Sequence, residues 1–241
     1  MGAAAVAIGQ LVNYKSAGTV EFLLQDGKFY LLEVNTRLQV EHPVTEEVVG
    51  VDLVKMQILT AMNKFIFTDL DVRIPRGHSI ECRVYAENPY MGGVPSTGLL
   101  GKVIWPEGPR RRYEFGFDQG DTITAFYDPM IAKVIVWDEN RLRAIEKMIR
   151  VLKDAVVFGV HTNIPYLIEI LSHEDFVNGT MTTRFIEKNF AEGLKSRHNE
   201  EDRKKISREI YKNIVVQKSA VNPTANNNSV NSPWLSYWRN I

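Results

Sequence analysis

Polar and apolar residues alternate in the segment LLEVNTRLQVE, residues 31–41. Polar side chains occupy every second position, at Glu33, Asn35, Arg37, Gln39 and Glu41. Because side chains alternate across a strand with period two, an extended segment would place these five residues on one face. We expect the other face to carry Leu32, Val34, Leu38 and Val40 into a core. The alternative is an amphipathic edge strand whose polar face is only solvated.

The rest of the pattern predicts helices and strands in separate blocks. Apolar spacing indicates helices over 2–14 and 51–62, the second capped by Asp52, around a hairpin that turns at Asp26-Gly27. Strands are predicted over 78–86, 101–105, 110–117 and 129–137. Helices are predicted over about 140–156, 163–172 and 181–190, the last capped by Thr180. This order, a helix and hairpin followed by strands and then helices, predicts an α+β fold.

Composition narrows the functional classes. The chain has 241 residues, of which 44% are hydrophobic, and equal numbers of basic and acidic residues, 29 each. This balance gives no reason to expect nucleic acid or an anionic membrane as a partner. The single cysteine, Cys82, excludes an internal disulfide framework, and we interpret it as a small core residue. The apolar runs of the chain are too short to span a bilayer.

Glu21 adds a second carboxylate to the alternating segment. It lies in GTVEFLL, on the strand before the turn. Opposed residues of an antiparallel pair share a face, so Glu21 stands opposite Glu33 if the loop has odd length, for instance Asp26-Gly27-Lys28. Two such carboxylates repel each other unless a cation lies between them. Glu21, Glu33 and the side-chain oxygen of Asn35 would suit Mg²⁺, which takes oxygen ligands and substrate phosphates.

Beyond these oxygen donors the segment offers a site for an oxyanion. A guanidinium such as that of Arg37 binds a planar anion through two parallel hydrogen bonds. A neighbouring carboxylate such as Glu41 can act as a general base. A metal, a nucleotide phosphate and a bound oxyanion together are what the activation of a small acid by ATP requires. For His42, which follows, we expect an orienting role rather than chemistry.

Several motifs resemble the second half of biotin carboxylase: AGTVEFLL, EVNTRLQVEHPVTE, ECRVYAENP, PSTGLLGKV and YDPMIAKVIVW. The resemblance covers about residues 1–190 and is nearest to α subunits of acyl-CoA carboxylases. It implies the C-terminal part of an ATP-grasp domain over 1–75 and a biotin carboxylase C-terminal domain over 76–193. We interpret 194–218 as a charged helical extension and 219–241 as a linker that begins a further module.

The resemblance also implies roles for individual residues. Glu21, Glu33 and Asn35 match ligands of Mg²⁺ or Mn²⁺, and Leu23, Leu32 and Glu33 match positions at ATP. Arg37, Gln39 and the Val40 backbone match the bicarbonate site. Glu41 matches the base that deprotonates bicarbonate, which then attacks the γ-phosphate to give carboxyphosphate. Arg112 is aligned with the arginine that stabilises the biotin enolate, although Arg110, Arg111 and Arg112 can also be read as a solvated basic strand end.

The parent enzyme implied by this resemblance is an ATP-dependent ligase. Its expected partners are a biotin carboxyl carrier domain or protein, a carboxyltransferase component and a second copy of itself. We expect it in the cytoplasm, or in the mitochondrial matrix of a eukaryote. Family segments with the glycine-rich lid and phosphate-binding lysines are expected before residue 1, so this chain alone is predicted to be inactive. Two alternatives stay open, another ATP-grasp ligase and an inactive dimerisation or assembly fragment.

Overall fold

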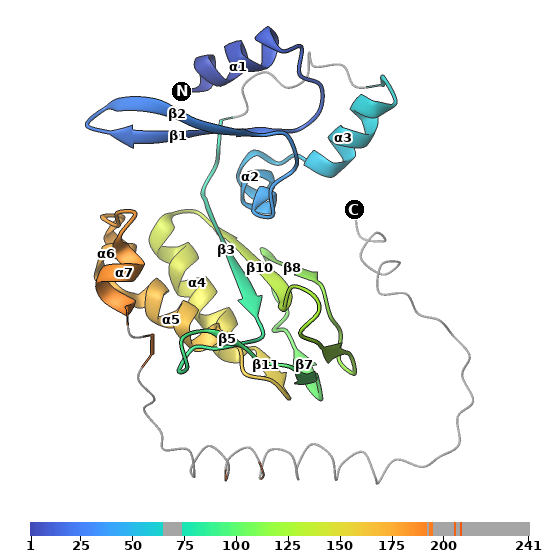
Figure 1. The fold of residues 1–241 in the computed structure, drawn as a ribbon, viewed down its shortest axis with the longest axis vertical. Coiled ribbons are helices and arrows are strands. Elements are labelled where there is room, and N and C mark those ends of the chain that lie inside the picture. Colours follow the sequence, from blue (N-terminus) through green and yellow to red (C-terminus); the bar gives the residue numbers. More distant parts are fainter. Residues whose placement is uncertain (65–73, 192, 195–204, 206–207, 209–241) are drawn as a thin grey trace. The chain divides into compact units, whose positions relative to one another are not determined.

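The computed structural model describes residues 1–64, 74–191 and 193–194, together with Lys205 and Arg208. Within this part of the chain, helices combine with antiparallel strand pairs in an α+β arrangement, as predicted (Figure 1). The expected extension over 194–218 and the linker over 219–241 lie almost wholly outside the described residues. Lys205 and Arg208 are both helical.

The hairpin consists of β1 (Thr19–Gln25) and β2 (Lys28–Asn35). Asp26 and Gly27 both have positive φ, 50° and 75°, and form a two-residue loop between the paired Gln25 and Lys28. Two consecutive positive φ values suit the right-handed twist of the strands. The expectation of a three-residue loop is therefore wrong. The pairing of Glu21 with Glu33 has a different cause.

A β-bulge supplies the extra residue. Phe22 pairs with Leu31, whereas Glu21 pairs with Glu33, so Leu32 is left without an opposite residue. The bulge shifts the register by one residue and brings the two carboxylate positions opposite each other.

The strand is shorter than the alternating pattern suggested. It ends at Asn35, and residues 36–41 form a bend and turn that lead into α2 (His42–Val49). The expected burial of the apolar positions of β2 is also wrong, because Leu32 is 66% exposed and Val34 is 41% exposed.

Three helices accompany the hairpin in sequence. They are α1 (Gly2–Leu11), α2 and α3 (Leu53–Ala61). The α2 helix was not predicted; it begins after Glu41 with Pro43 in its first turn and ends at Gly50, which has a left-handed conformation. Asp52 caps α3 as predicted, because its Oδ1 accepts a hydrogen bond of 2.7 Å from the Lys55 backbone amide.

The central sheet has the strand order β3-β10-β8, all antiparallel. Its strands are β3 (His78–Tyr85), β10 (Met130–Asp138) and β8 (Arg111–Phe115). One face packs against α4 (Arg141–Asp154), and the core there includes Val84, Val134 and Met148, all fully buried. The opposite face of β3 and β10 contacts α2. Both faces are thus covered, which explains why six consecutive residues of β10, Ile131 to Val136, are buried.

Short elements complete the second half of the chain. The paired strands are β4 (Glu87–Asn88) with β5 (Val94–Pro95), β6 (Gly98–Leu99) with β9 (Thr122–Ile123), and β7 (Lys102–Ile104) with β11 (Val156–Phe158). The last helices are α5 (Ile164–Ser172), α6 (Glu174–Asn178) and α7 (Phe185–Phe190). The predicted cap Thr180 is wrong: α7 begins after Arg184, and the Thr180 hydroxyl donates to Asp175 instead.

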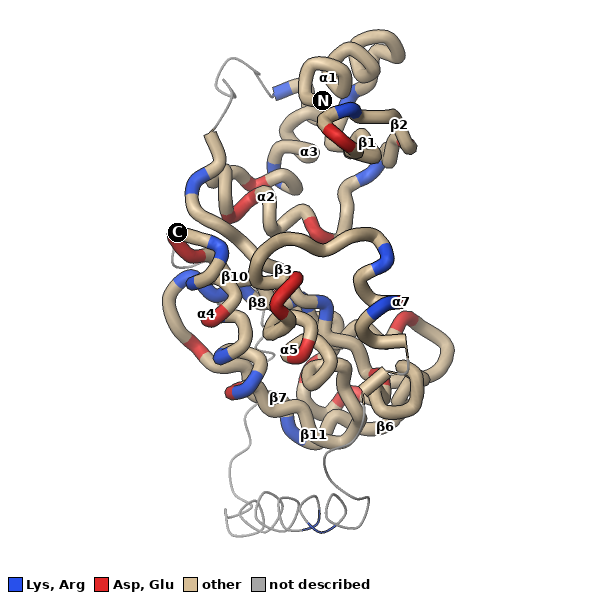
Figure 2. The backbone as a smooth tube through the Cα atoms, turned by 90° about the vertical axis from the view of Figure 1, so that its left-hand side faces the viewer, with Lys and Arg blue, Asp and Glu red and all other residues tan. Residues whose placement is uncertain are grey.

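Charged residues of both signs are interspersed along the backbone (Figure 2). None of the helices in the described part of the chain is long and apolar enough to cross a membrane.

Candidate functional site

The two hairpin carboxylates meet through a side-chain amide. Glu21 and Glu33 are paired across β1 and β2. The Asn35 Nδ2 atom donates to Glu21 Oε1 at 2.7 Å and to Glu33 Oε1 at 3.0 Å. The three side chains therefore converge on one side of the hairpin, as the sequence predicted. The bulge at Leu32, rather than the loop, produces this arrangement.

Gln39 joins the same cluster. Its Nε2 atom donates to Glu21 Oε1 at 2.9 Å, although Gln39 lies after the end of β2. Arg37 does not join it, because its Nη1 donates to the neighbouring Leu38 carbonyl at 3.2 Å. The turn over 36–41 thus places the side-chain amide of Gln39 against the carboxylate of Glu21. The guanidinium of Arg37 does not contact the hairpin carboxylates.

The chemistry of this cluster fits a hard divalent cation. It contributes two carboxylates and two amides, and a half-turn of the Asn35 amide would exchange Nδ2 for Oδ1. In the described ranges, no three His, Cys, Asp or Glu side chains converge as a metal site. The two carboxylates of the cluster suit Mg²⁺, which binds through one or two carboxylates together with substrate phosphates and water. Leu23 and Leu32, the expected adenine neighbours, are 49% and 66% exposed.

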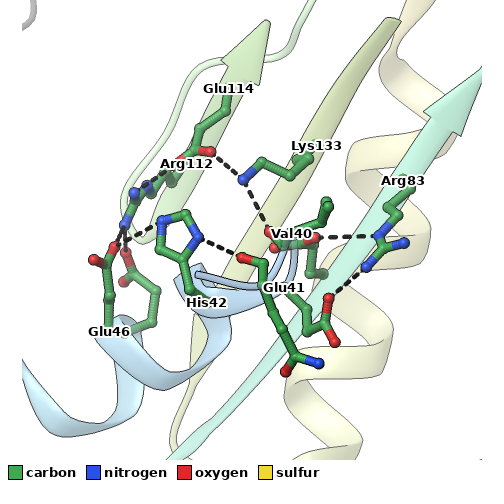
Figure 3. Close-up of polar contacts among 11 residues, drawn as sticks. Val40, Glu41, His42, Glu46, Arg83, Arg112, Glu114 and Lys133 are labelled. Carbon is green, nitrogen blue, oxygen red and sulfur yellow. Dashed lines mark hydrogen bonds and ion pairs between the residues drawn. The ribbon is translucent and has the colours of Figure 1, made fainter. Parts of the chain in front are cut away.

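Glu41 lies at the N-cap of α2 and faces the central sheet. Its Oε2 atom accepts a hydrogen bond of 2.5 Å from Arg83 Nη2 on β3 (Figure 3). Both side chains are partly exposed, at 51% and 38%. The cation beside the predicted base is therefore Arg83, which the sequence analysis did not select. The period-two pattern of ECRVY was the available signal, since it puts Glu81, Arg83 and Tyr85 on one strand face.

The backbone of the same turn is held from two directions. Lys133 on β10 donates from Nζ to the Val40 carbonyl at 3.0 Å and forms an ion pair with Glu114 on β8 (Figure 3). The His42 Nδ1 atom lies 2.8 Å from the Gln39 carbonyl oxygen. His42 thus orients its neighbours, as expected. These contacts fix the segment that the sequence analysis assigned to bicarbonate.

Arg112 occupies a different part of this face. It donates to Glu46 Oε2 at 2.7 Å, forms an ion pair with Glu114 and lies 3.6 Å from Glu47 Oε1. Burial alone would lower the pKa of Arg112, but its hydrogen bond to Glu46 and the charges of Glu114 and Glu46 outweigh burial and raise that pKa. Arg112 is thus tied to carboxylates on α2 and β8, and its role at biotin stays a prediction.

Glu114 couples the two halves of this network. Burial would raise its pKa, whereas the hydrogen bond from Lys133 and the charge of Arg112 have the opposite effect and lower it overall. Glu114 is therefore held ionised between two cations. Glu114 pairs with both Lys133, which binds the Val40 carbonyl, and Arg112, which pairs with Glu46 of α2. These side chains therefore form one connected network.

Two further residues, Asp128 and Cys82, have structural roles. Asp128, before Pro129, accepts a hydrogen bond of 2.9 Å from the Met130 amide, as a turn residue does. Cys82 is 5% exposed and belongs to the core. Neither residue contributes to the network around Glu41.

Two protein families match separate parts of this chain. Residues 81–188 match the family described as biotin carboxylase C-terminal domain. Residues 1–68 match the family described as carbamoyl-phosphate synthase L chain, ATP binding domain. The pair of Glu41 and Arg83 joins the two matched segments.

Curated relatives are similar over most of this chain. Biotin carboxylase of Halalkalibacterium halodurans is 42% identical over 188 residues, which is 77% of this chain and 41% of that protein. The mitochondrial propionyl-CoA carboxylase alpha chain of Sus scrofa is 44% identical over 206 residues, 84% of this chain and 28% of that protein. The chain therefore spans less than half the length of these relatives.

Solved structures agree with the sequence matches. The biotin carboxylase domain dimer of Hydrogenobacter thermophilus 2-oxoglutarate carboxylase, in complex with MgADP and bicarbonate, has a TM-score of 0.75 and 41% identity. The alignment covers 78% of this chain and 42% of that one. Rhizobium etli pyruvate carboxylase has a TM-score of 0.78 and 36% identity, over 84% of this chain and 20% of that one.

Proposed function

We propose that this chain, which belongs to the biotin carboxylase C-terminal domain family over residues 81–188, is part of an ATP-dependent biotin carboxylase. The parent reaction would use ATP and bicarbonate to carboxylate biotin. The observation that carries this proposal is the hydrogen-bonded cluster of Glu21, Glu33, Asn35 and Gln39. It gathers oxygen donors for a nucleotide-bound Mg²⁺ beside the turn that leads to Glu41.

In this proposal Glu21, Glu33 and Asn35 hold Mg²⁺ or Mn²⁺. The ion, when bound with ATP, neutralises charge on the phosphates. Leu23 and Leu32 lie near adenine. Gln39 and the Val40 backbone bind bicarbonate together with Arg37, whose guanidinium contacts only its own turn in the described structure. The Lys133 contact to the Val40 carbonyl keeps that part of the turn in place.

Glu41 is the proposed general base. It takes the bicarbonate proton, the bicarbonate oxygen attacks the γ-phosphorus, and ADP leaves as carboxyphosphate forms. Arg83 Nη2 lies 2.5 Å from Glu41 Oε2. Its guanidinium would place a positive charge beside the biotin enolate. Arg112 is the arginine that the sequence analysis assigned to the biotin enolate. The geometry supports Arg83 for that charge-stabilising role, with Arg112 holding α2 against the sheet through Glu46.

The partners of the parent follow from the same proposal. Biotin would be presented by a carrier domain or protein, and the carboxyl group would pass on to a carboxyltransferase that acts on an acyl-CoA or a 2-oxo acid. The parent would form a homodimer in the cytoplasm or the mitochondrial matrix. Support for the dimer comes from the Hydrogenobacter thermophilus domain, which is described as one.

The decisive experiment measures ADP release by the full-length parent with bicarbonate and free biotin, each omitted in turn. We expect ADP formation to require bicarbonate and to rise with biotin, and ¹⁴C-bicarbonate to label biotin. ADP formation that ignores biotin would contradict the proposal and favour another ATP-grasp ligase. A dimer without nucleotide binding would favour an assembly fragment.

A further inference from the structure

Glu81 is a buried carboxylate that the proposed mechanism does not use. Its side chain is 4% exposed, on β3 two residues before Arg83. Within the described residues neither of its oxygens receives a hydrogen bond. Its nearest cation is Arg83, whose Nε lies 3.9 Å from Glu81 Oε1. An ionised carboxylate so placed is costly, because burial removes water and no donor replaces it.

Arg83 therefore stands between two carboxylates. Its Nη2 contacts Glu41, and its Nε faces Glu81. The guanidinium has its five N–H donors in a fixed fork, so one cation can serve both carboxylates from different sides. Whatever charge Glu81 carries must alter how strongly Arg83 attracts Glu41.

The sheet face around Glu81 has more carboxylates than cations. Cross-strand pairing lines up Arg83, Lys133 and Glu114 in one row, and Glu81, Ile135 and Arg112 in the next. The groups on this face and on the segment packed against it are three cations, five carboxylates and one histidine: Arg83, Lys133, Arg112, Glu41, Glu46, Glu47, Glu81, Glu114 and His42.

The other carboxylates already occupy these cations. Lys133 pairs with Glu114, and Arg112 pairs with Glu46 and Glu114 and lies near Glu47. Glu81 has only the 3.9 Å ion pair with Arg83 and receives no hydrogen bond among the described residues. Burial raises its pKa to about 7, against the lowering influence of Lys133 and Arg83, while the charges of Glu114 and Glu41 raise it further.

We propose that Glu81 is a positioning residue that sets the strength of the Glu41–Arg83 ion pair by gaining and losing a proton. When Glu81 is protonated, Arg83 directs its charge to Glu41 alone and weakens it as a base. When Glu81 is ionised, Arg83 is shared, and repulsion between the two carboxylates strengthens the base. Glu81 itself never touches substrate. This inference rests on the proposed function for its catalytic consequence and on the geometry alone for the coupling.

The first test uses the 241-residue chain and needs no activity. Glutamate carboxyl ¹³C resonances are followed by NMR between pH 4 and 9, with Glu81 and Glu41 assigned through Glu81→Gln and Glu41→Gln. We expect Glu81 to titrate near pH 7 and Glu41 to show a second inflection at that pH. Glu81→Gln should abolish this inflection. Titration of wild-type Glu81 near its ordinary value would overturn the proposal.

Thermal stability gives an independent readout of the same proton. A carboxyl whose pKa is raised in the folded state makes folding less favourable as pH rises from about 4.5 to about 7, because the unfolded chain loses the proton first. The melting temperature of Glu81→Gln relative to wild type should therefore increase by several degrees from pH 5 to pH 8. Glu146→Gln, on the exposed side of α4, is the matched control and should show no such change.

The catalytic consequence is measured in the full-length parent. The pH profile of kcat/KM for bicarbonate-dependent ATP cleavage should match between wild type and Glu81→Gln near pH 6. Above pH 7 the variant should fall behind by up to about tenfold, a part of the roughly 10²–10⁴-fold that a positioned general base contributes. Parallel profiles would overturn the positioning role. If the parent lacks this activity altogether, the proposed function fails, whereas the NMR titration still decides the coupling.

Discussion

Arg83 Nη2 lies 2.5 Å from Glu41 Oε2, although the two residues are 42 positions apart in the chain. Glu41 ends the turn after the hairpin, and Arg83 lies on β3, which pairs with β10 in the central sheet. Together with the contacts of Arg112 to Glu46 and of Lys133 to Val40, this hydrogen-bonded ion pair joins the segment that matches an ATP-binding domain to the segment that matches a biotin carboxylase domain. Any chemistry at Glu41 takes place beside this guanidinium.

Replacing each arginine of the sheet face separates their roles. In the full-length parent, Arg83→Ala should impair biotin carboxylation more than biotin-independent ATP cleavage, because it removes the cation at the proposed site of charge development. Arg112→Ala should impair both only as far as it loosens α2. Rates of ADP release and of biotin labelling measure the two activities. A selective loss of biotin carboxylation in Arg112→Ala would restore the assignment made from sequence.

Glu41 can be tested as the base through its isosteric amide. Glu41→Gln in the parent should lower bicarbonate-dependent ATP cleavage by about 10²–10⁴-fold, the usual effect of losing a general base. MgATP affinity should change little, because the nucleotide would be held by the hairpin cluster rather than by Glu41. Equilibrium binding of a non-hydrolysable analogue provides that comparison. Turnover within a few-fold of wild type would exclude Glu41 as the base.

The alternation of polar and apolar residues predicted the hairpin and the pairing of Glu21 with Glu33, but not the bulge that produces this pairing. The paired leucines Leu31 and Leu32 interrupt the alternation, so the sequence permits either a longer loop or a bulge. Turn geometry decides, because Asp26 and Gly27 both adopt positive φ and close the loop with two residues. The extra residue then has to be absorbed within β2, at Leu32.

The contact between Arg83 and Glu41 could not be predicted from local sequence patterns, because it joins residues far apart in the chain. The period-two spacing showed that Arg83 and Glu81 share a strand face, but not that this face meets α2 and Glu41. The α2 helix was missed as well, since HPVTEEVV is short and has only a few apolar positions. Long-range packing of α2 on β3 and β10 is what turns separate charges into one network.

The ion pair between Arg112 and Glu46 should stabilise the fold. The Glu46 side chain is 5% exposed and also accepts a hydrogen bond of 2.6 Å from the Leu53 amide, so it links α2, α3 and β8. Arg112→Met would leave this buried carboxylate without its cation. We expect a loss of about 2–3 kcal/mol in unfolding free energy, below the range of about 3–5 for fully buried pairs because Arg112 is 34% exposed.

The double variant provides the control for that measurement. Glu46→Gln with Arg112→Met removes both charges while keeping an oxygen that can accept from Leu53. Urea denaturation of the four proteins in this cycle should show that the double variant recovers most of the loss. Additive losses would mean that the two side chains stabilise the fold independently.

Cys82 should report on opening of the core. Burial, and after it the charge of Glu81, raises the pKa of the Cys82 thiol to about 12. The reactive thiolate is therefore scarce in the folded chain at pH 8, and the side chain is 5% exposed. Iodoacetamide at pH 8 should modify Cys82 slowly in buffer and rapidly in 8 M urea, as followed by mass spectrometry. Equal rates would show that the β3 segment is open in solution.

The 241-residue chain should not by itself cleave ATP with bicarbonate and biotin. Its hairpin offers two carboxylates beside largely exposed residues, and the sequence contains no complete glycine-rich loop to bind the phosphates. Mg²⁺ bound by so few protein oxygens keeps most of its water and is held weakly without a phosphate ligand.

Calorimetry with MgATP and a phosphate-release assay on the purified chain test this last prediction. We expect no binding in the micromolar range and no bicarbonate-dependent phosphate above that of Glu33→Ala. This variant removes one carboxylate of the hairpin pair and leaves the central sheet intact, so it controls for contaminating ATPases. Micromolar binding abolished by Glu33→Ala would show that the hairpin cluster and the turn to Glu41 suffice for the nucleotide, and that further segments of the relatives are dispensable for this step.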